Sequence, residues 1–263
     1  MDDLRVKWYG TAAVLLELNG TRLLFDPFIP VNKRLYMPSA EDWSAVRYIF
    51  VTHGHYDHTA AIPAVLKING GSATVCCTAA PRETLIQKGV EERCLRIVAP
   101  GGSVTAGPFE IQVYKGKHIV FDKRLIIKTF CSPRLLLNLR NLFRIIRASK
   151  GCDEAGETVV YGVRARDKNI LLMGSMNLDG GTEYPTQADL LILPFQGRSD
   201  VNEYAMDFIR RLQPKKVLLT HFDDSFPPVS SAVDTARFLS SMKQAYPGIP
   251  VIRPQAGGDW IYV

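Results

Sequence analysis

The sequence lacks any apolar run long enough to cross a bilayer, and no apolar signal core follows its acidic start. We therefore expect a cytoplasmic protein without a transmembrane segment. Its five cysteines are odd in number and form no Cys-x-x-Cys pair, so neither a disulfide framework nor a zinc knuckle is indicated. No glycine pattern matches a phosphate-binding or dinucleotide-binding loop, which argues against a nucleotide-binding fold built on such a loop.

The composition is that of a globular protein. The chain has 263 residues, of which 46% are hydrophobic and 22% charged, enough to bury a large core in one α/β domain or two small ones. Its formal net charge of +6 favours anionic partners in general without identifying one. Predicted strands alternate with helices and antiparallel hairpins, and Asn19-Gly20 predicts a tight hairpin turn. We expect two mixed β-sheets with helices outside.

The most informative segment is His53-Gly54-His55-Tyr56-Asp57-His58, which directly follows a predicted buried strand. Alternation along an extended chain places His53 and His55 on the same side. A turn or helix start at Tyr56 would bring Asp57 and His58 round from another direction. Neutral imidazole and carboxylate are ligands for Zn or a similar divalent ion, and these four groups suffice to begin two sites. Since the chain has only five histidines, three in this segment favour a metal site over a polar surface turn.

This segment resembles the His-x-His-x-Asp-His signature of the metallo-β-lactamase superfamily. The resemblance implies an α/β fold, a four-layer αββα sandwich of two mixed β-sheets, with residues 1–263 as a single domain. The two remaining histidines each follow a predicted strand. In the superfamily pattern the first metal ion would be held by His53, His55 and His118, and the second by Asp57, His58 and His221. The implied cofactor is one or two divalent ions, Zn first, with Mn or Fe as alternatives.

Three further residues bear on this implied centre. Asp26, before Pro27, either accepts a hydrogen bond from a ligand histidine, as a similarly placed aspartate does in the superfamily, or only forms a turn. Superfamily hydrolases usually have a bridging aspartate where this chain has Ser175, so we predict a firmly held first ion and a weaker second one. Asp179 is an alternative ligand. Ser175 is not an expected nucleophile, because its surroundings lack the Gly-x-Ser-x-Gly elbow.

The implied activity is hydrolysis of an ester-like bond by a metal-bound hydroxide, with Asp57 as the catalytic residue that orients it. Segments such as Leu193-Pro194-Phe195 are similar to the branch that contains L-ascorbate-6-phosphate lactonases and N-acyl-phosphatidylethanolamine phospholipases. We therefore predict a small anionic substrate, a lactone or a phosphodiester. The alternatives are a metal-dependent nuclease and a non-catalytic metal-binding or sensor protein. Nucleic acid is not the expected partner, because no substrate-clamping basic module stands out.

Residues 119–156 fit the superfamily pattern least and predict a helical insertion. Within it, residues 134–149 have a helical period with leucines on one face and arginines on the other. Such a basic amphipathic helix is a lid, an oligomer contact or a peripheral contact with anionic lipid, or it packs on its own domain with a solvated basic face. The expected phosphate contacts are Lys115, Lys117, Arg134, Arg140 and Arg144.

Overall fold

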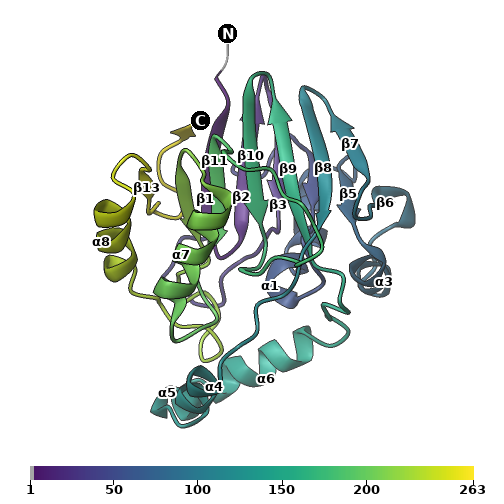
Figure 1. The fold of residues 1–263 in the computed structure, drawn as a ribbon. Helices are drawn as coiled ribbons and strands as arrows, with labels where there is room; N and C mark the ends of the chain where they lie inside the picture. The colour runs from purple at the N-terminus through teal and green to yellow at the C-terminus, as the bar shows by residue number, and fades with distance from the viewer. Residues whose placement is uncertain (1–2) are drawn as a thin grey trace.

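Two β-sheets stacked face to face form the middle of the molecule (Figure 1). The computed structural model describes residues 3–263, except for the side chains of Lys128 and Phe130. In this range each sheet has seven strands. Helices cover the outer faces, and three further helices project at one end of the sandwich.

The first sheet combines an antiparallel meander with a parallel half. β1 to β3 are antiparallel, and β3 to β6 are parallel. The β2–β3 hairpin turns at Asn19 and Gly20, both with positive φ, as the sequence predicted. The strands in spatial order are β14 (Ile261–Tyr262), β1 (Arg5–Gly10), β2 (Ala13–Leu18), β3 (Thr21–Phe25), β4 (Val46–Phe50), β5 (Thr74–Cys77) and β6 (Leu95–Ile97).

The second sheet repeats this plan. β7 to β10 are antiparallel, and β10 to β13 are parallel. Both sheets are therefore mixed, as predicted. The strands in spatial order are β13 (Val251–Ile252), β12 (Val217–Thr220), β11 (Leu190–Pro194), β10 (Lys168–Met173), β9 (Val159–Ala165), β8 (Phe109–Lys115) and β7 (Ser103–Ala106).

Alternating side chains of β2 show how the layers are held together. Val14 and Leu16 belong to the apolar core that also contains the inward residues of the second sheet, while Ala13 and Leu15 belong to a second core on the other face. The second core packs the first sheet against α2 (Ile62–Ile68) and α3 (Ala79–Gln87). Residues of α7 (Val201–Leu212) and α8 (Ala236–Ala245) join the core of the second sheet. The predicted αββα arrangement is thus confirmed.

The helical insertion differs in detail from the prediction. Residues 134–149 form two helices, α5 (Pro133–Leu137) and α6 (Leu139–Ala148), instead of one. The break falls at Asn138, whose backbone leaves the helical region and whose side-chain amide donates to the Arg134 carbonyl at 2.9 Å. A further helix, α4 (Lys123–Phe130), was not predicted, although Asp122 caps it by accepting from the Leu125 N–H.

Much of the apolar side of α5 and α6 is exposed to solvent. Leu136, Leu139, Phe143 and Ile146 are all exposed, so the side of residues 134–149 that carries them does not pack on the domain. The physical reason is that α6 contacts the body through another side, where Ile145 is buried. Within the described residues, no helix combines the length and apolar character needed to cross a membrane.

Candidate metal centre

The candidate metal ligands lie after the ends of strands, at one edge of the sandwich. The segment from His53 to His58 follows β4, His118 follows β8, and His221 follows β12. Asp26 and Ser175 follow β3 and β10. Because β3 and β4 are parallel neighbours, as are β10 to β12, their carboxyl ends share an edge. The one-turn helix α1 (Tyr56–Thr59) changes the chain direction within the segment, as predicted.

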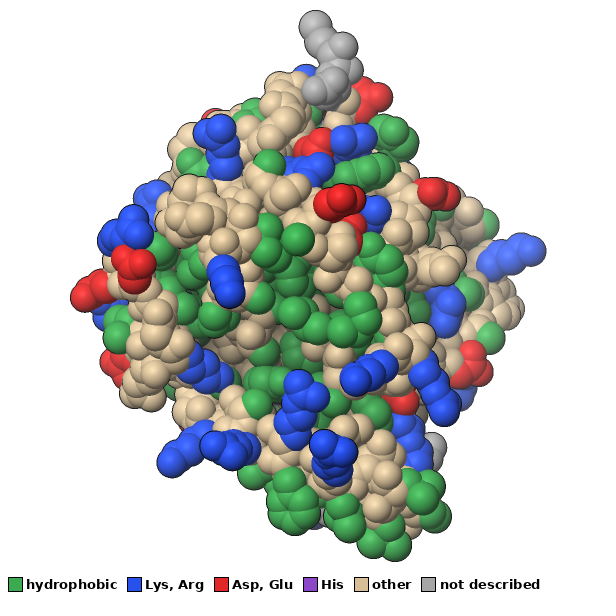
Figure 2. All heavy atoms as spheres, turned by 180° about the vertical axis from the view of Figure 1, so that it is seen from behind, with side chains coloured by type: hydrophobic (Ala, Val, Ile, Leu, Met, Phe, Trp, Pro, Cys, Tyr) green, Lys and Arg blue, Asp and Glu red, His purple; other side chains and the backbone are tan. Residues whose placement is uncertain are grey.

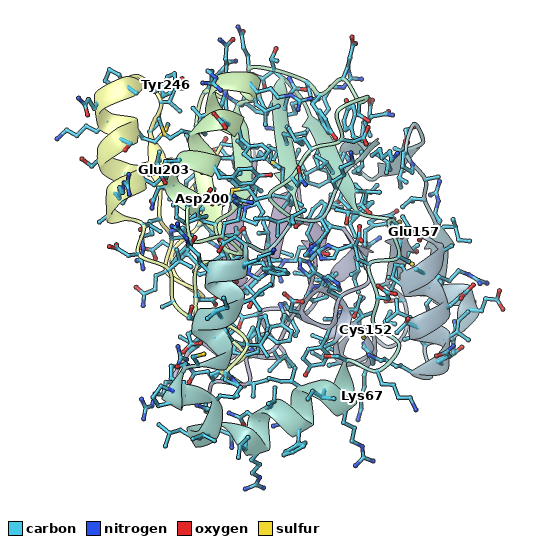
Figure 3. All side chains as sticks on the ribbon, turned by 60° about the horizontal axis from the view of Figure 1, so that its bottom comes forward. Lys67, Cys152, Glu157, Asp200, Glu203 and Tyr246 are labelled. Carbon is cyan, nitrogen blue, oxygen red and sulfur yellow. The ribbon has the colours of Figure 1, made fainter. Side chains whose placement is uncertain are left out.

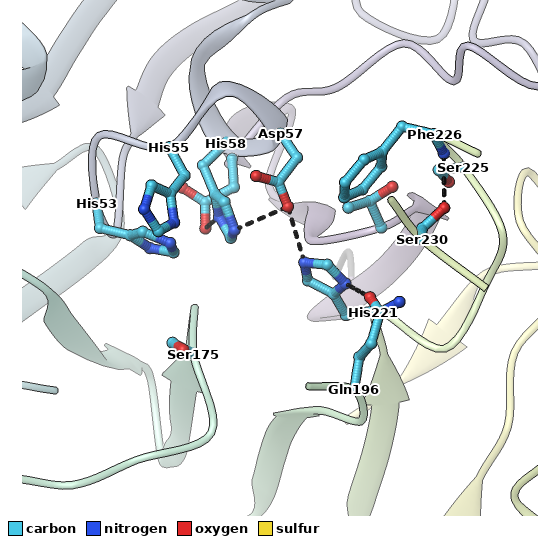
Figure 4. Close-up of polar contacts among 12 residues, drawn as sticks. His53, His55, Asp57, His58, Ser175, Gln196, His221, Ser225, Phe226 and Ser230 are labelled. Atoms are coloured by element: carbon cyan, nitrogen blue, oxygen red, sulfur yellow. Dashed lines mark hydrogen bonds and ion pairs between the residues drawn. The ribbon is translucent and has the colours of Figure 1, made fainter. Parts of the chain in front are cut away.

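These side chains form two adjacent groups, and Figure 4 shows His53 and His55 of one group near Asp57, His58 and His221 of the other. One consists of three imidazoles, the other of one carboxylate and two imidazoles, and in each group the candidate ligand atoms lie within 4.8 Å of one another. The ring centroids of His53 and His58 are 3.9 Å apart, which places the groups side by side. The first group is His53, His55 and His118, and the second is Asp57, His58 and His221.

The buried carboxylate of Asp26 orients an imidazole of each group. Its Oδ2 accepts from His58 Nδ1 at 2.9 Å and from the Thr52 hydroxyl at 2.6 Å. Since that hydroxyl donates its hydrogen to Asp26, its oxygen accepts from His53 Nδ1, 3.0 Å away. Both imidazoles therefore carry their proton on Nδ1, and this leaves the lone pair of Nε2 free for a metal ion.

Two other imidazoles are oriented in the same way. His118 Nδ1 donates to the Ile119 carbonyl at 2.9 Å, and His221 Nδ1 donates to Gln196 Oε1 at 2.6 Å. His53 Nε2 is buried without a hydrogen-bond partner among the described residues. A buried nitrogen without a partner destabilises the folded state unless a hydrogen-bond donor or a metal ion binds it. The residues therefore fit a divalent metal ion.

Burial and neighbouring charges set the protonation of the groups. Burial lowers the pKa of His53 well below its ordinary value and lowers that of His55. Burial, together with the nearby His55, lowers the pKa of His118 to about 4. Burial alone would raise the pKa of Asp57, but the imidazoles of His58, His221 and His55 together outweigh burial and the pKa falls. At neutral pH the first group is neutral and Asp57 is anionic, as metal ligation requires.

Two glycines permit the close approach of chain segments at the centre. A Cβ on Gly174, directly after β10, would lie 1.9 Å from Thr52 Oγ1. A Cβ on Gly54 would lie 2.0 Å from the carbonyl oxygen of Asp153, where the chain returns from the insertion. Only glycine allows both contacts, because any side chain would overlap these atoms.

Ser175 contacts the first group through the backbone. Its hydroxyl accepts from the Ile119 N–H at 2.9 Å, and the Ile119 carbonyl in turn accepts from His118 Nδ1. Ser175 is buried and lines the cavity at the two groups. Its direct contact in the structure is therefore with the segment that carries His118.

A cavity of about 240 Å³ opens on both groups. One arginine, Arg198, is part of its lining among the described residues. Its guanidinium donates to both carboxylate oxygens of Asp200 at 2.6 and 2.7 Å, so its charge is already paired. Most of the remaining wall is apolar: Ile119, Phe121, Leu125, Met176, Pro194, Phe226, Val229 and Val233.

The other predicted residues lie elsewhere. Asp179 is outside both groups, and its Oδ1 lies 3.4 Å from Lys117 Nζ and 3.7 Å from Lys115 Nζ. These lysines therefore neutralise Asp179, and neither lines the cavity. The three arginines expected to contact phosphate line a separate cavity between the insertion and residues 31–34: Arg134, Arg140 and Arg144.

Sequence reasoning missed two kinds of supporting residue. Thr52 directly precedes the histidine segment, but a threonine is not a typical metal ligand. Gln196, which holds His221, follows β11 with no recognisable pattern. The turn at Thr11 also supports His221, whose N–H donates to the Thr11 carbonyl at 2.7 Å and whose φ is +60°. Such a φ is strained for a non-glycine residue and needs this support.

The family model described as β-lactamase superfamily domain matches residues 5–221, which include all six candidate ligands. This chain belongs to the β-lactamase superfamily. The superfamily predicted from the histidine segment is thereby confirmed.

Curated relatives and solved structures agree with this family. A "UPF0173 metal-dependent hydrolase" of Methylobacterium nodulans is 28% identical over 259 residues, covering 97% of this chain and 98% of the relative. Another, of Methylocella silvestris, is 30% identical over 115 residues, 44% of this chain, and the match spans about half of that relative, 48%. The solved structure of a metallo hydrolase from Ignicoccus hospitalis has a TM-score of 0.66 at 18% identity, covering 99% of this chain and 98% of that one. The fold is that of the superfamily.

Proposed function

We propose that this superfamily member is a metal-dependent hydrolase that cleaves an ester-like bond, in a lactone or a phosphodiester, of a small anionic substrate in the cytoplasm. The observation that carries the proposal is the convergence of two ligand groups on one cavity. Similarity to metal-dependent hydrolases supports it. Zn is the proposed ion, with Mn or Fe as alternatives, because imidazole and carboxylate ligands accommodate all three.

The two ligand groups and Asp57 would have different roles in the reaction. A bound divalent ion supplies a nucleophilic water at neutral pH and polarises the oxygen of the scissile bond. The first group would hold one ion and the second group the other. The Asp57 carboxylate, ionised at neutral pH, would also accept a hydrogen bond from the attacking water and so orient it. The apolar wall would exclude other water from the cavity.

The cavity suggests a substrate with an apolar and an anionic part. Phe121, Leu125 and Val229 offer contact to an apolar part. An anionic part would be attracted by the bound ions. These features suit the lactonase-like and phospholipase-like branch, which we propose from the sequence resemblance.

The test is an assay of the zinc-loaded and manganese-loaded protein against lactones, thioesters, phosphodiesters and RNA. We expect turnover of a lactone or phosphodiester and a loss in kcat of about 100-fold or more in Asp57→Asn. Asp207→Asn, the same change at an exposed position on α7, is the control and should leave kcat unchanged.

Other outcomes identify the alternatives. Cleavage of RNA in preference to small esters would identify a nuclease. Full metal loading without turnover of any substrate would identify a non-catalytic metal-binding or sensor protein. A loss of folding in Asp57→Asn equal to the loss of activity, measured by urea denaturation, would assign Asp57 a structural role.

A further inference from the structure

Exposed large hydrophobic side chains are concentrated in the insertion. Nine of the sixteen large hydrophobic side chains that are exposed in the described part of the chain lie between residues 120 and 146. Leu136 is 72% exposed, Leu137 83% and Phe143 68%. Soluble proteins rarely leave such a cluster in contact with water unless the cluster binds something.

The apolar stripe of α6 points away from the body. At about 100° per residue, Leu139, Phe143 and Ile146 share one side of the helix. Ile145, 6% exposed, and Ala148, whose carbonyl accepts from Lys88 Nζ at 3.1 Å, lie on roughly the opposite side. The helix is therefore held to the body by one side and presents its apolar stripe outward.

A stripe of arginines runs beside the apolar stripe, one residue further along α6. It lines a cavity of about 1250 Å³ between the insertion and two loops of the body. Among the described residues, Asp224 is the one carboxylate in this lining, and it pairs with Arg134 at 2.6 Å. The other cations of the lining are Lys33, Arg34, Arg140, Arg144 and Arg147.

The charge of the insertion is one-sided. Residues 119–150 contain eight lysines and arginines and one acidic residue, Asp122. Figure 2 shows lysine and arginine side chains in a band, with hydrophobic side chains below them at the tip of the molecule. Figure 3, turned so that this end comes forward, shows the teal helices of the insertion reaching outward from the body. Apolar residues at a tip and cations set behind them match the order of acyl chains and phosphates at a membrane surface.

We propose that the insertion docks the protein on a bilayer that contains anionic phospholipid. Leu136, Leu137 and Phe143 would enter the boundary of the acyl chains, and the arginine stripe would lie at the level of the phosphates. The two features together select this partner. A second copy of the chain would bring arginine stripes of like charge together, and nucleic acid would leave the apolar stripe in water.

Docking would place the metal centre beside the bilayer. Phe121 and Leu125, which line the cavity at the two ligand groups, belong to the same insertion. The docking surface itself is independent of the proposed hydrolase activity, because it contains none of the candidate ligands.

The test is co-sedimentation of the full chain with vesicles of phosphatidylcholine alone and of phosphatidylcholine with about one third phosphatidylglycerol. We expect binding to the anionic vesicles, weakened by salt because exposed charges are screened. The double variant Phe143→Ser, Ile146→Ser should bind about tenfold more weakly or worse. The double variant Arg140→Gln, Arg144→Gln should also bind more weakly and show a smaller salt dependence. Ile97→Ser, an equally polar change at an exposed position on β6, is the control and should bind as the wild type does.

Failure to bind anionic vesicles would overturn the proposal, as would wild-type binding by both double variants. Dimerisation of the wild type that Phe143→Ser, Ile146→Ser abolishes, without vesicle binding, would assign the surface to a second copy. Tighter binding to RNA than to anionic vesicles would assign it to nucleic acid. Thermal unfolding of each variant verifies that the fold is intact.

Discussion

Asp26 and His58 form a buried pair in which Asp26 Oδ2 accepts the Nδ1 hydrogen of His58 at 2.9 Å. The other carboxylate oxygen, Oδ1, accepts from the Thr52 N–H at 2.8 Å. Because Thr52 in turn fixes His53, this single carboxylate determines the orientation of an imidazole in each ligand group. Substitution of Asp26 therefore tests the hydrogen bonds that orient the candidate ligands without changing the ligands themselves.

Asp26→Asn should weaken metal binding by about 10-fold to 100-fold, because an amide is a poorer acceptor for the His58 Nδ1 hydrogen. Asparagine tolerates the positive φ of 44° at this position, so the backbone is preserved. Metal affinity is measured by competition with a chromophoric chelator. Asp207→Asn is the matched control, and equal affinity in all three proteins would contradict this role of Asp26.

Gly174→Ala should destabilise the protein by about 1–3 kcal/mol or more, because the added Cβ would lie 1.9 Å from Thr52 Oγ1. The quantity to measure is the free energy of unfolding in urea. Gly180→Ala provides the comparison, since a Cβ there would have no heavy atom within 4 Å. Similar stabilities of the two variants would show that the contact between Gly174 and Thr52 relaxes without cost.

Metal ions should leave the protein in two steps during titration with a chelator. Ser175 offers no anionic bridge, so Asp57 is the one carboxylate among the six candidate ligands. We expect the ion of the second group to leave first and that of the first group to remain. Metal content measured after dialysis at increasing chelator concentration checks this. Simultaneous loss of both ions would refute the inequality of the two sites.

The metal-free protein should lose stability as the pH falls from about 6.5 toward 4. His118 has a pKa of about 4 in the folded state and an ordinary value of 6.5, so the folded state binds fewer protons between them. The lowered pKa values of His53 and His55 act in the same direction. Asp26 and Asp57 outweigh burial and raise the pKa of His58, which opposes the effect.

Urea unfolding at several pH values in the presence of a chelator measures this dependence. His118→Gln should reduce the decline in unfolding free energy between pH 6.5 and 4, because it removes one of the groups responsible. An unchanged decline in this variant would mean that His118 is protonated alike in the folded and unfolded states.

The features that the sequence predicted are those determined by neighbours in the chain. Asn19-Gly20 forms the predicted hairpin because its turn is local. The segment from His53 to His58 follows a strand and contains a helix start at Tyr56, as predicted, for the same reason. His118 and His221 could be chosen as candidate ligands only because the family resemblance supplied the ligand pattern. A lone histidine after a strand has no distinctive pattern of its own.

The features that were missed depend on contacts between distant segments. The hydrogen bond from His221 to Gln196 joins two loops, and no local sequence pattern predicts it. The periodicity of residues 134–149 correctly predicted helix and an apolar face, but it could not say which face meets the body. The burial of Ile145 shows which side of α6 meets the body.

The close approach of Gly174 to Thr52 also joins the two sheets, because Thr52 follows a strand of the first sheet and Gly174 a strand of the second. The Thr52 carbonyl also accepts from the Val159 N–H at 2.8 Å, so the same residue bridges the sandwich twice. The relative position of the two sheets therefore determines how the imidazoles are arranged. A shift of one sheet against the other would therefore change the distance from His118, which follows β8, to His53 and His55, which follow β4.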